Sequence, residues 1–345
     1  METSNTVDNT LDWFLNSPIY NGEAYLACYG AKKKTPVYPE ITAYAISLCC
    51  ILYERRRDTI FLERAEKCAE YMMKISKNGG IPCLEDGLLY TFDTGIFISG
   101  MLDLYAINTK EVYRQKVEES LKWLCSMWNG EQFAAVNDVP ARKGWEHAPS
   151  VHLVKLAIPL LKASFYLRDT NCERKAFKIL DKYMSFQLKE GRFQIDEKTS
   201  LTLTHPHCYA TEAYLYSYYR TKQEKYLEVA KKASAWLTEV QNKDGSFYSA
   251  YSPGNEDSHA EKTTDCTSQA TRIWKLLGIN QEGIDKAYQY LNSALKGNGL
   301  RLSSNSSLKG RLLFWRRPVY SWPTFFYIHS LILPFGRIEY CSELF

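Results

Sequence analysis

Six stretches of the chain are apolar nearly all the way round a helix. They cover residues 40–56, 93–108, 150–167, 207–221, 265–278 and 322–336. A helix with apolar residues on every side has to be buried over most of its surface. The pattern therefore predicts six inner helices.

Charge-rich segments of a second kind lie between these stretches. Their apolar residues recur at the i, i+3/i+4, i+7 spacing of an amphipathic helix, and their other face is polar. Such outer helices are expected at residues 61–76, 110–128, 172–188, 224–241 and 282–296, with a sixth at residues 7–16.

Successive inner segments begin 53 to 58 residues apart, and a repeat of this kind determines the architecture. We expect an all-α fold, an (α/α)6 toroid of six outer–inner helix pairs, in which the first outer helix closes against the last inner one. The series has no long linker, so a single domain is expected over residues 1–345.

The connections alternate in length. Those from an outer to an inner helix are long and rich in Gly, Pro and aromatic residues, as in NGEQFAAVNDVPARKGWEHAP at 129–149, whereas inner-to-outer turns are short. Function is usually carried by long loops over a rigid scaffold. We therefore expect the N-termini of the inner helices to surround one mouth.

Ionisable side chains stand at or near the start of most inner helices. A carboxylate there is often only a helix cap, and this interpretation stays open for Asp93. Glu40 instead follows a proline, while Glu212 and Arg272 lie inside apolar helices, where a charge must be paired or face a cavity.

Carboxyl and imidazole groups gathered on one rim are what acid/base chemistry on a sugar requires. The expected catalytic residues are Glu40, Asp93, His205, His207 and Glu212. The expected substrate-binding residues are Tyr38, His147, His152, Asp265, Arg272, Tyr320 and Trp322.

A metal ion is the rival explanation for the sequence His205-Pro206-His207, with Glu212 as a third ligand. Neither an HExxH motif nor a Cys/His pairing at zinc spacing is present. We therefore expect a metal-free cluster and no cofactor.

Composition and net charge limit the classes of ligand that the protein is expected to bind. The 25 Tyr, 15 Phe and 8 Trp suit a cavity that grips flat or ring-shaped ligands, and a net charge of +4 without a long basic block disfavours nucleic acid. An oligosaccharide or a sugar-containing small molecule is expected. Cations in or near the long connections favour an anionic sugar: Arg142, Lys143, Arg272, Arg316 and Arg317.

The cysteines and the lengths of the apolar stretches indicate in which cellular compartment the protein is expected. The ten cysteines form no CxxC pair, which favours a reducing compartment. The sequence shows neither a signal-peptide pattern nor an apolar run of about 18 residues. We expect a cytoplasmic protein without a membrane span, and the oligomeric state stays open.

Several motifs at the starts of the expected inner helices resemble those of six-hairpin glycosidase-like proteins of prokaryotic polysaccharide-biosynthesis clusters. They are YPEIT at 38–42, FDTG at 92–95, HPHCY at 205–209 followed by Glu212, and D-x-x-x-Q-x-x-R at 265–272. The resemblance covers nearly the whole chain. It extends more loosely to unsaturated glucuronyl hydrolases, N-acylglucosamine 2-epimerases and glucuronyl C5-epimerases.

This resemblance implies a role for particular residues. In the hydrolases an inner-helix Asp is the acid/base, a role that Asp93 matches. In the 2-epimerases a pair of histidines has it, a role open to His205 or His207 together with His152. The resemblance implies a glycoside hydrolase or a sugar epimerase and does not decide between hydrolysis and proton abstraction.

Two alternatives stay open. VQNKDGSFYS at 240–249 and FQLKEGRF at 186–193 are similar to the Q-x-x-x-G-x-F/W turn of terpene cyclases and protein prenyltransferases, although the DxDD cluster is absent and Asp265 and Cys266 are adjacent where a zinc pattern would separate them. The Gln is then expected to cap an outer helix and the Gly to let the chain reverse. A non-catalytic polysaccharide-binding protein is the other alternative.

Overall fold

The computed structural model describes residues 2–31, 35–138, 144–253, 261–304 and 317–345. The chain divides into two compact units. The α2–α7 unit comprises residues 21–26, 36–185 and 343–345, and the α8–α13 unit comprises residues 1–20, 27–35 and 186–342. The single domain expected over residues 1–345 stays a prediction, which limited proteolysis can test.

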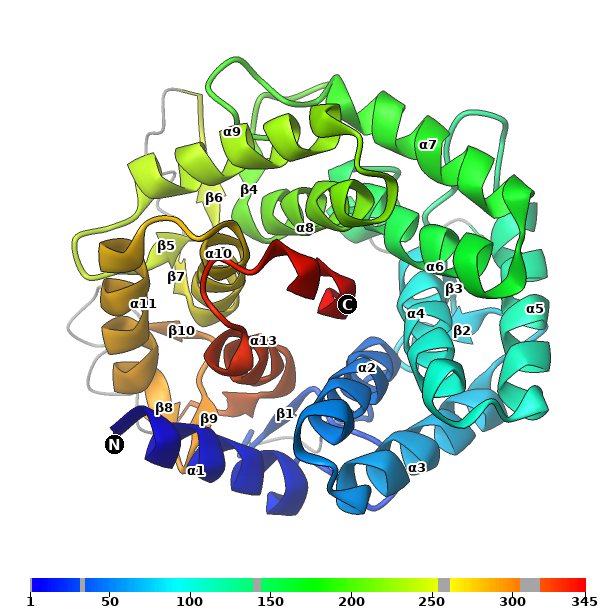
Figure 1. Ribbon diagram of the computed structural model, residues 1–345, viewed down its shortest axis with the longest axis horizontal. Coiled ribbons are helices and arrows are strands. Elements are labelled where there is room, and N and C mark those ends of the chain that lie inside the picture. Colours follow the sequence, from blue (N-terminus) through cyan, green and yellow to red (C-terminus); the bar gives the residue numbers. More distant parts are fainter. Residues whose placement is uncertain (1, 32–34, 139–143, 254–260, 305–316) are drawn as a thin grey trace. The chain divides into compact units, whose positions relative to one another are not determined.

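The α2–α7 unit is built from two layers of helices (Figure 1). The inner layer holds α2 (Pro39–Arg56), α4 (Thr91–Asn108) and α6 (Ala157–Leu167). The outer layer holds α3 (Thr59–Ile75), α5 (Glu111–Ser126) and α7 (Thr170–Met184). Each inner helix packs against the outer helix that follows it, and α4 packs between α2 and α6.

The α8–α13 unit repeats this arrangement (Figure 1). Its inner helices are α8 (Thr204–Thr221), α10 (Thr264–Leu277) and α13 (Ser321–Ile332), and its outer helices are α9 (Glu224–Val240), α11 (Gln281–Ala294) and α1 (Glu2–Asn16). Helix α1 packs on α13, where the rings of Phe14 and Phe325 meet with centroids 5.1 Å apart. The prediction that the first outer helix closes against the last inner one is confirmed.

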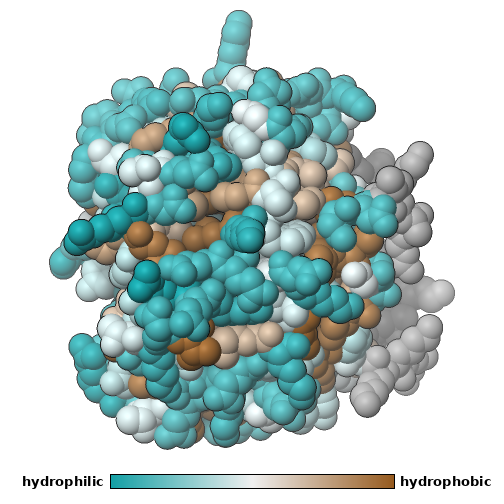
Figure 2. Space-filling view, turned by 90° about the vertical axis from the view of Figure 1, so that its right-hand side faces the viewer, coloured by the Kyte–Doolittle hydropathy of each residue, from teal (hydrophilic) through white to brown (hydrophobic). Residues whose placement is uncertain are grey.

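Burial explains the layers. In α4 every residue from Thr91 to Leu102 is buried, whereas α7 buries one stripe and exposes a polar face. Figure 2 shows a face of the molecule on which hydrophilic side chains predominate, with hydrophobic residues visible between them. None of the helices within the described ranges is long and apolar enough to cross a membrane.

Two inner helices differ from their expected bounds because of prolines. The segment expected to be one helix over 150–167 begins as a 3-10 helix, η2 (Val151–Leu156), before α6. Pro159 has no N–H to donate to the preceding turn, which favours tighter winding there. Helix α13 ends at Ile332 because Leu333 precedes Pro334 and is extended, with φ −64° and ψ 133°.

The inner-to-outer turns are short because the inner helices end abruptly. Five of them are followed by a residue in the left-handed conformation: Arg57, Thr109, Arg168, Lys222 and Gly278. Asp58 and Asp169 then cap the next outer helices by accepting backbone N–H groups.

Two-residue antiparallel strands tie the long connections together. In the α2–α7 unit, β2 (Ile81–Pro82) pairs with β3 (Leu89–Tyr90). In the α8–α13 unit the two-stranded pairs are β1 (Cys28–Tyr29) with β11 (Val319–Tyr320), β4 (Thr202–Leu203) with β6 (Ala250–Tyr251), and β8 (Leu295–Lys296) with β9 (Gly299–Leu300). A three-stranded sheet there joins β5 (Phe247–Tyr248), β7 (Lys262–Thr263) and β10 (Ser303–Ser304). Short 3-10 helices also form at η1 (Trp145–His147) and η4 (Ile338–Glu343).

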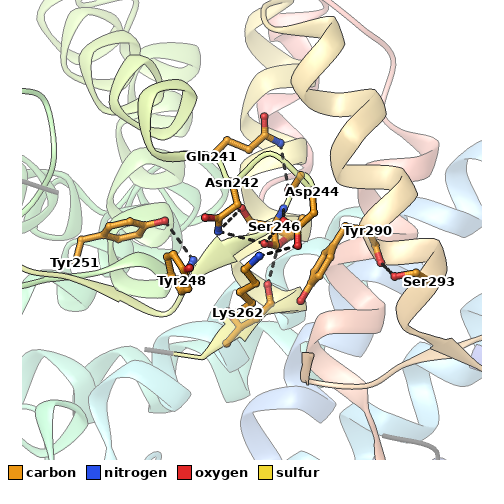
Figure 3. Close-up of polar contacts among 12 residues, drawn as sticks. Gln241, Asn242, Asp244, Ser246, Tyr248, Tyr251, Lys262, Tyr290 and Ser293 are labelled. Carbon is orange, nitrogen blue, oxygen red and sulfur yellow. Dashed lines mark hydrogen bonds and ion pairs between the residues drawn. The ribbon is translucent and has the colours of Figure 1, made fainter. Parts of the chain in front are cut away.

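The chain reverses direction after α9 in a Q-x-x-x-G turn that side-chain hydrogen bonds stabilise (Figure 3). The side-chain amide of Gln241 donates to the carbonyl of Gly245 at 3.1 Å and to that of Gly283 in α11 at 2.8 Å. Gly245 has φ +85°, and a Cβ there would lie 2.2 Å from the carbonyl oxygen of Lys286. The glutamine thus links one outer helix to the next rather than only capping its own.

Candidate functional site

The first turns of the inner helices share a pattern of anchors. The first residue donates its hydroxyl to a carbonyl of a neighbouring connection in four helices: Thr91, Thr204, Thr264 and Ser321. The fourth residue accepts the N–H of a connection residue in the three inner helices α2, α4 and α13, through the hydroxyls of Thr42, Thr94 and Thr324. At least one anchor lies close to the second residue of each of these helices, which is Glu40, Phe92, His205, Asp265 or Trp322.

In the α2–α7 unit two carboxyl groups are buried at helix starts. Glu40 is 9% exposed and Asp93 is 6% exposed. Burial, followed by the charges of Glu40 and Asp86, raises the pKa of Asp93 well above its ordinary value. Burial and neighbouring negative charge both favour the protonated form of this carboxyl group.

Tyr38 lies directly before α2 and is half-buried. The charge of Glu40 raises the pKa of Tyr38, burial raises it further, and the phenol is hydrogen-bonded to the Glu40 carboxylate. The structure therefore brings together three of the predicted residues, namely Tyr38, Glu40 and Asp93. The environment of Asp93 favours its protonated form, whereas the Glu40 carboxylate accepts a hydrogen bond from Tyr38.

Sequence reasoning missed Asp86 and Tyr90 on the connection that enters α4. The Tyr90 hydroxyl donates to Asp86 Oδ2 at 2.7 Å, and the predicted His147 places Nε2 3.9 Å from the same oxygen. The rings of Tyr90 and His147 lie 5.8 Å apart between centroids. Only helix starts were considered, whereas Asp86 belongs to the Asp-Gly turn between β2 and β3.

His152 lies in η2 and is 2% exposed. Its Nδ1 shares a short hydrogen bond with the hydroxyl of Ser150, and its ring packs against Phe92 with centroids 5.3 Å apart. These contacts fix the orientation of the imidazole at the start of the third inner segment.

In the α8–α13 unit a second cluster forms from three predicted residues. His205 Nδ1 lies 3.5 Å from Asp265 Oδ2, and the Trp322 indole N–H donates to this same oxygen at 3.2 Å. The three residues are the second residues of α8, α10 and α13. The ring of Tyr320, on β11, lies edge-on to Trp322 with centroids 4.9 Å apart.

Cys266 adds a thiol to this cluster. One potential ligand atom from each of His205, Asp265 and Cys266 lies within 4.8 Å of the others. Burial and the neighbouring Asp265 raise the pKa of the Cys266 thiol well above its ordinary value. The metal ligands considered from the sequence paired His205 with His207 and Glu212 instead, and Asp265 and Cys266 were set aside as a zinc pattern because they are adjacent.

Glu212 and Arg272 form an ion pair deeper in the same unit. Both side chains are fully buried, and Arg272 Nη2 lies 2.8 Å from Glu212 Oε1. The guanidinium also lies over the ring of Phe326, 4.8 Å from its centroid. The charge of each side chain is thus compensated inside the helix layer, as a charge in an apolar helix requires.

His207 is held by the backbone on both sides of its ring. Nδ1 accepts the N–H of Phe193 at 3.2 Å, and Nε2 donates to the carbonyl of Ala233 at 3.2 Å. Burial lowers the pKa of His207 to about 3. His207 is the fourth residue of α8, the position at which α2, α4 and α13 have their threonine anchors, and its contacts are those of an anchoring residue; its catalytic role stays a prediction.

The cations expected to select an anionic sugar are differently placed. Arg142, Lys143 and Arg316 lie outside the described residues. Arg272 is paired with Glu212, and Arg317 donates to the backbone carbonyl of Ser303 at 3.1 Å. Neither of the two described arginines therefore carries the anion-binding expectation.

Comparisons with known proteins identify the fold. No protein-family model matches the chain, and no curated protein matches it either. Among solved structures, cellobiose 2-epimerase from Bacillus thermoamylovorans is similar at a TM-score of 0.77 and 10% identity, over 96% of this chain and 99% of that one. An unsaturated glucuronyl hydrolase from a Bacillus species is similar at 0.72 and 12% identity, over 96% of each chain.

A third similar structure is an α-1,6-mannanase from a Salegentibacter species, with a TM-score of 0.67 and 11% identity over 95% of this chain and 98% of that one. These proteins share the six-hairpin architecture. The chain therefore has the all-α (α/α)6 toroid fold that its sequence predicts. At these identities the likeness shows the fold alone.

Proposed function

We propose that the protein is a carbohydrate-active enzyme that acts on a saccharide by acid/base chemistry at Asp93 and Glu40. One observation carries the proposal: Asp93 is a buried carboxyl group whose pKa is raised by burial and by the charge of Glu40. A carboxyl group kept protonated beside a second carboxyl group is the arrangement that glycosidases use for their acid and its partner.

The two groups have separate roles in this proposal. Asp93 is the acid. It donates a proton to the leaving glycosidic oxygen if the reaction is hydrolysis, or to a ring carbon if it is epimerisation. Glu40, which accepts a hydrogen bond from Tyr38, is the carboxylate that activates water or removes a proton. Asp86, which also acts on the pKa of Asp93, helps to keep that acid protonated.

The fold neighbours and the composition of the chain support a saccharide as the substrate. Proteins of this fold include a glucuronyl hydrolase, a cellobiose epimerase and a mannanase. The abundant aromatic residues suit the faces of sugar rings. We propose a uronic-acid-like substrate, and paired assays with glucuronyl and neutral disaccharides test this preference directly.

Incubation of candidate oligosaccharides with the protein in deuterated water, followed by mass spectrometry, tests the reaction. Cleavage indicates a hydrolase, and deuterium at a ring carbon of uncleaved sugar indicates an epimerase. We expect Asp93→Asn and Glu40→Gln each to reduce kcat by about 100-fold or more, whereas Glu85→Gln, a charge change in the exposed connection beside Asp86, leaves it unchanged. Full turnover in both Asp93→Asn and Glu40→Gln would refute the proposal, and binding without turnover in the wild type would indicate a binding protein.

A further inference from the structure

The cluster at the start of α10 has the composition of a transition-metal site. Imidazole, carboxylate and thiolate are the ligands that Zn²⁺ binds in proteins. His205, Asp265 and Cys266 supply one of each, and their ligand atoms lie within 4.8 Å of one another. The donors come from two helices, since His205 is on α8 and the other two are on α10.

The distance between His205 and Asp265 is compatible with a bridging zinc ion. Their Nδ1 and Oδ2 atoms are 3.5 Å apart. A charge-assisted hydrogen bond between such groups is normally shorter, at about 2.7–2.9 Å. Tetrahedral zinc with bonds of about 2.0–2.2 Å to nitrogen and oxygen places those two atoms roughly 3.4 Å apart.

Other contacts orient Asp265, and one of them, from the Cys266 thiol, would be replaced by the ion because zinc binds the deprotonated thiolate. Oδ1 accepts the backbone N–H of Cys266 at 2.8 Å, and Oδ2 accepts the indole N–H of Trp322 at 3.2 Å. Each carboxylate oxygen has a second acceptor position. Hydrogen bonds of this kind fix the direction of ligating carboxylates in metal sites.

The solvent exposure of the three side chains indicates a site that is open to solvent on one side. Cys266 is 1% exposed, whereas the side chains of His205 and Asp265 keep 20% and 12% of their surface exposed. The ring of Tyr209 covers one side of His205, with centroids 4.3 Å apart. Three protein ligands with partial access to solvent leave the fourth position of a tetrahedral ion to water or to a substrate atom.

We propose that His205, Asp265 and Cys266 bind one Zn²⁺ ion with an open fourth coordination position. The proposal goes beyond the acid/base function, because none of the three residues belongs to the Asp93 and Glu40 pair. It replaces the metal-free expectation, which rested on the absence of an HExxH motif and of a Cys/His pairing at zinc spacing.

Titration of the reduced full-length protein with Zn²⁺ and with Co²⁺ tests this proposal without any substrate. We expect one Zn²⁺ per chain by competition with a chromophoric chelator, and a thiolate-to-cobalt charge-transfer band in the Co²⁺ form. Cys266→Ser should abolish the band and weaken Zn²⁺ binding by at least about tenfold. Cys341→Ser, a change at another buried cysteine of the same unit, should preserve both.

Two further variants separate ligation from folding. Asp265→Asn should weaken Zn²⁺ binding and keep the charge-transfer band, because the thiolate remains. Trp322→Phe should weaken binding by roughly tenfold and also keep the band, since the indole only positions Asp265. A wild-type Co²⁺ spectrum without the band, or a Cys266→Ser protein that retains it, would overturn the proposal.

Discussion

Arg272 and Glu212 are each the ninth residue of their inner helices, and their side chains form a fully buried ion pair with Nη2 2.8 Å from Oε1. Equal positions in neighbouring repeats thus face each other across α8 and α10, which pack together. The sequence indicated that both charges needed compensation, and the pair provides it within the protein. A structural role is therefore a simpler explanation for both residues than a role in catalysis or substrate binding.

Removal of one partner should destabilise the fold. Glu212→Gln leaves the Arg272 charge buried without its counter-ion, and we expect a loss of about 3–5 kcal/mol in the free energy of unfolding. Urea denaturation measures this loss. Glu118→Gln, which breaks the exposed Arg114–Glu118 pair with its 3.2 Å distance, is the control and should leave the midpoint nearly unchanged.

The double variant distinguishes structure from catalysis at this pair. Replacing both partners by apolar residues, as in Glu212→Leu with Arg272→Met, should recover most of the lost stability, because no charge remains buried. Saccharide turnover should recover with the stability. A stable double variant without turnover would instead indicate that the pair takes part in the chemistry.

The raised pKa of Asp93 should make the stability of the protein depend on pH. The folded state keeps a proton on Asp93 at pH values where the unfolded chain has released it, so stability falls as pH rises above the ordinary Asp value of about 3.9. Asp93→Asn removes this penalty. We expect the variant to be more stable than the wild type at pH 7 and the difference to shrink toward pH 4.

Urea midpoints of both proteins between about pH 4 and 8 measure this difference. Loss of activity together with a gain in stability is expected when a catalytic acid sits in an environment that disfavours its charged form. Equal stability of the two proteins at every pH would show that Asp93 ionises normally in the fold.

Cys125, near the end of α5, should be the most reactive thiol of the α2–α7 unit. A hydrogen bond from Cys172 on α7 lowers the pKa of Cys125 to about 7, although partial burial opposes the shift. A thiolate forms there at neutral pH, so iodoacetamide should modify Cys125 first, at a rate that rises with pH through about 7. Peptide mapping by mass spectrometry checks the order.

Two comparisons sharpen this test. Cys68 is buried, and burial raises its pKa to about 12, so it should stay unmodified in the folded protein. Cys172→Ala removes the hydrogen-bond donor and should slow the modification of Cys125 at pH 7 by roughly tenfold. Unchanged reactivity in Cys172→Ala would show that the thiol pair does not set the pKa.

The helix layers were predictable from sequence because burial determines periodicity. Helix α4 has no polar face and α7 has a wide one, and this contrast recurs every 53 to 58 residues. The two-residue strands were not predicted, because pairs such as Ile81–Pro82 with Leu89–Tyr90 are too short to show an alternating pattern.

The candidate sites were predictable only in part. Helix starts identified Glu40, His205 and Asp265, each the second residue of its helix, and Asp93, the third residue of α4. The partners were beyond the sequence, since they depend on side-chain direction. Nothing in the sequence HPHCY shows that the second histidine faces the backbone of Phe193 and Ala233, or that Cys266 lies beside His205.

His207 provides the sharpest test of the distinction between anchor and catalyst. Its imidazole stays neutral in the folded protein because burial lowers its pKa to about 3, whereas in the unfolded chain it takes up a proton near pH 6.5. Protons then favour the unfolded state, so stability is lost as pH falls below about 6.5. This residue alone should cost about 2 kcal/mol between pH 7 and pH 5.

His207→Gln keeps one acceptor for the Phe193 N–H and one donor for the Ala233 carbonyl, without a group that titrates in this range. We expect the variant to fold, to lose that acid sensitivity in urea denaturation at pH 5, and to keep kcat within about twofold of the wild type, because the ring nitrogens face the backbone. Nitrogen-15 NMR of the wild type should show no titration of His207 between pH 5 and 8. A folded His207→Gln protein without turnover would restore the catalytic role that the sequence suggested.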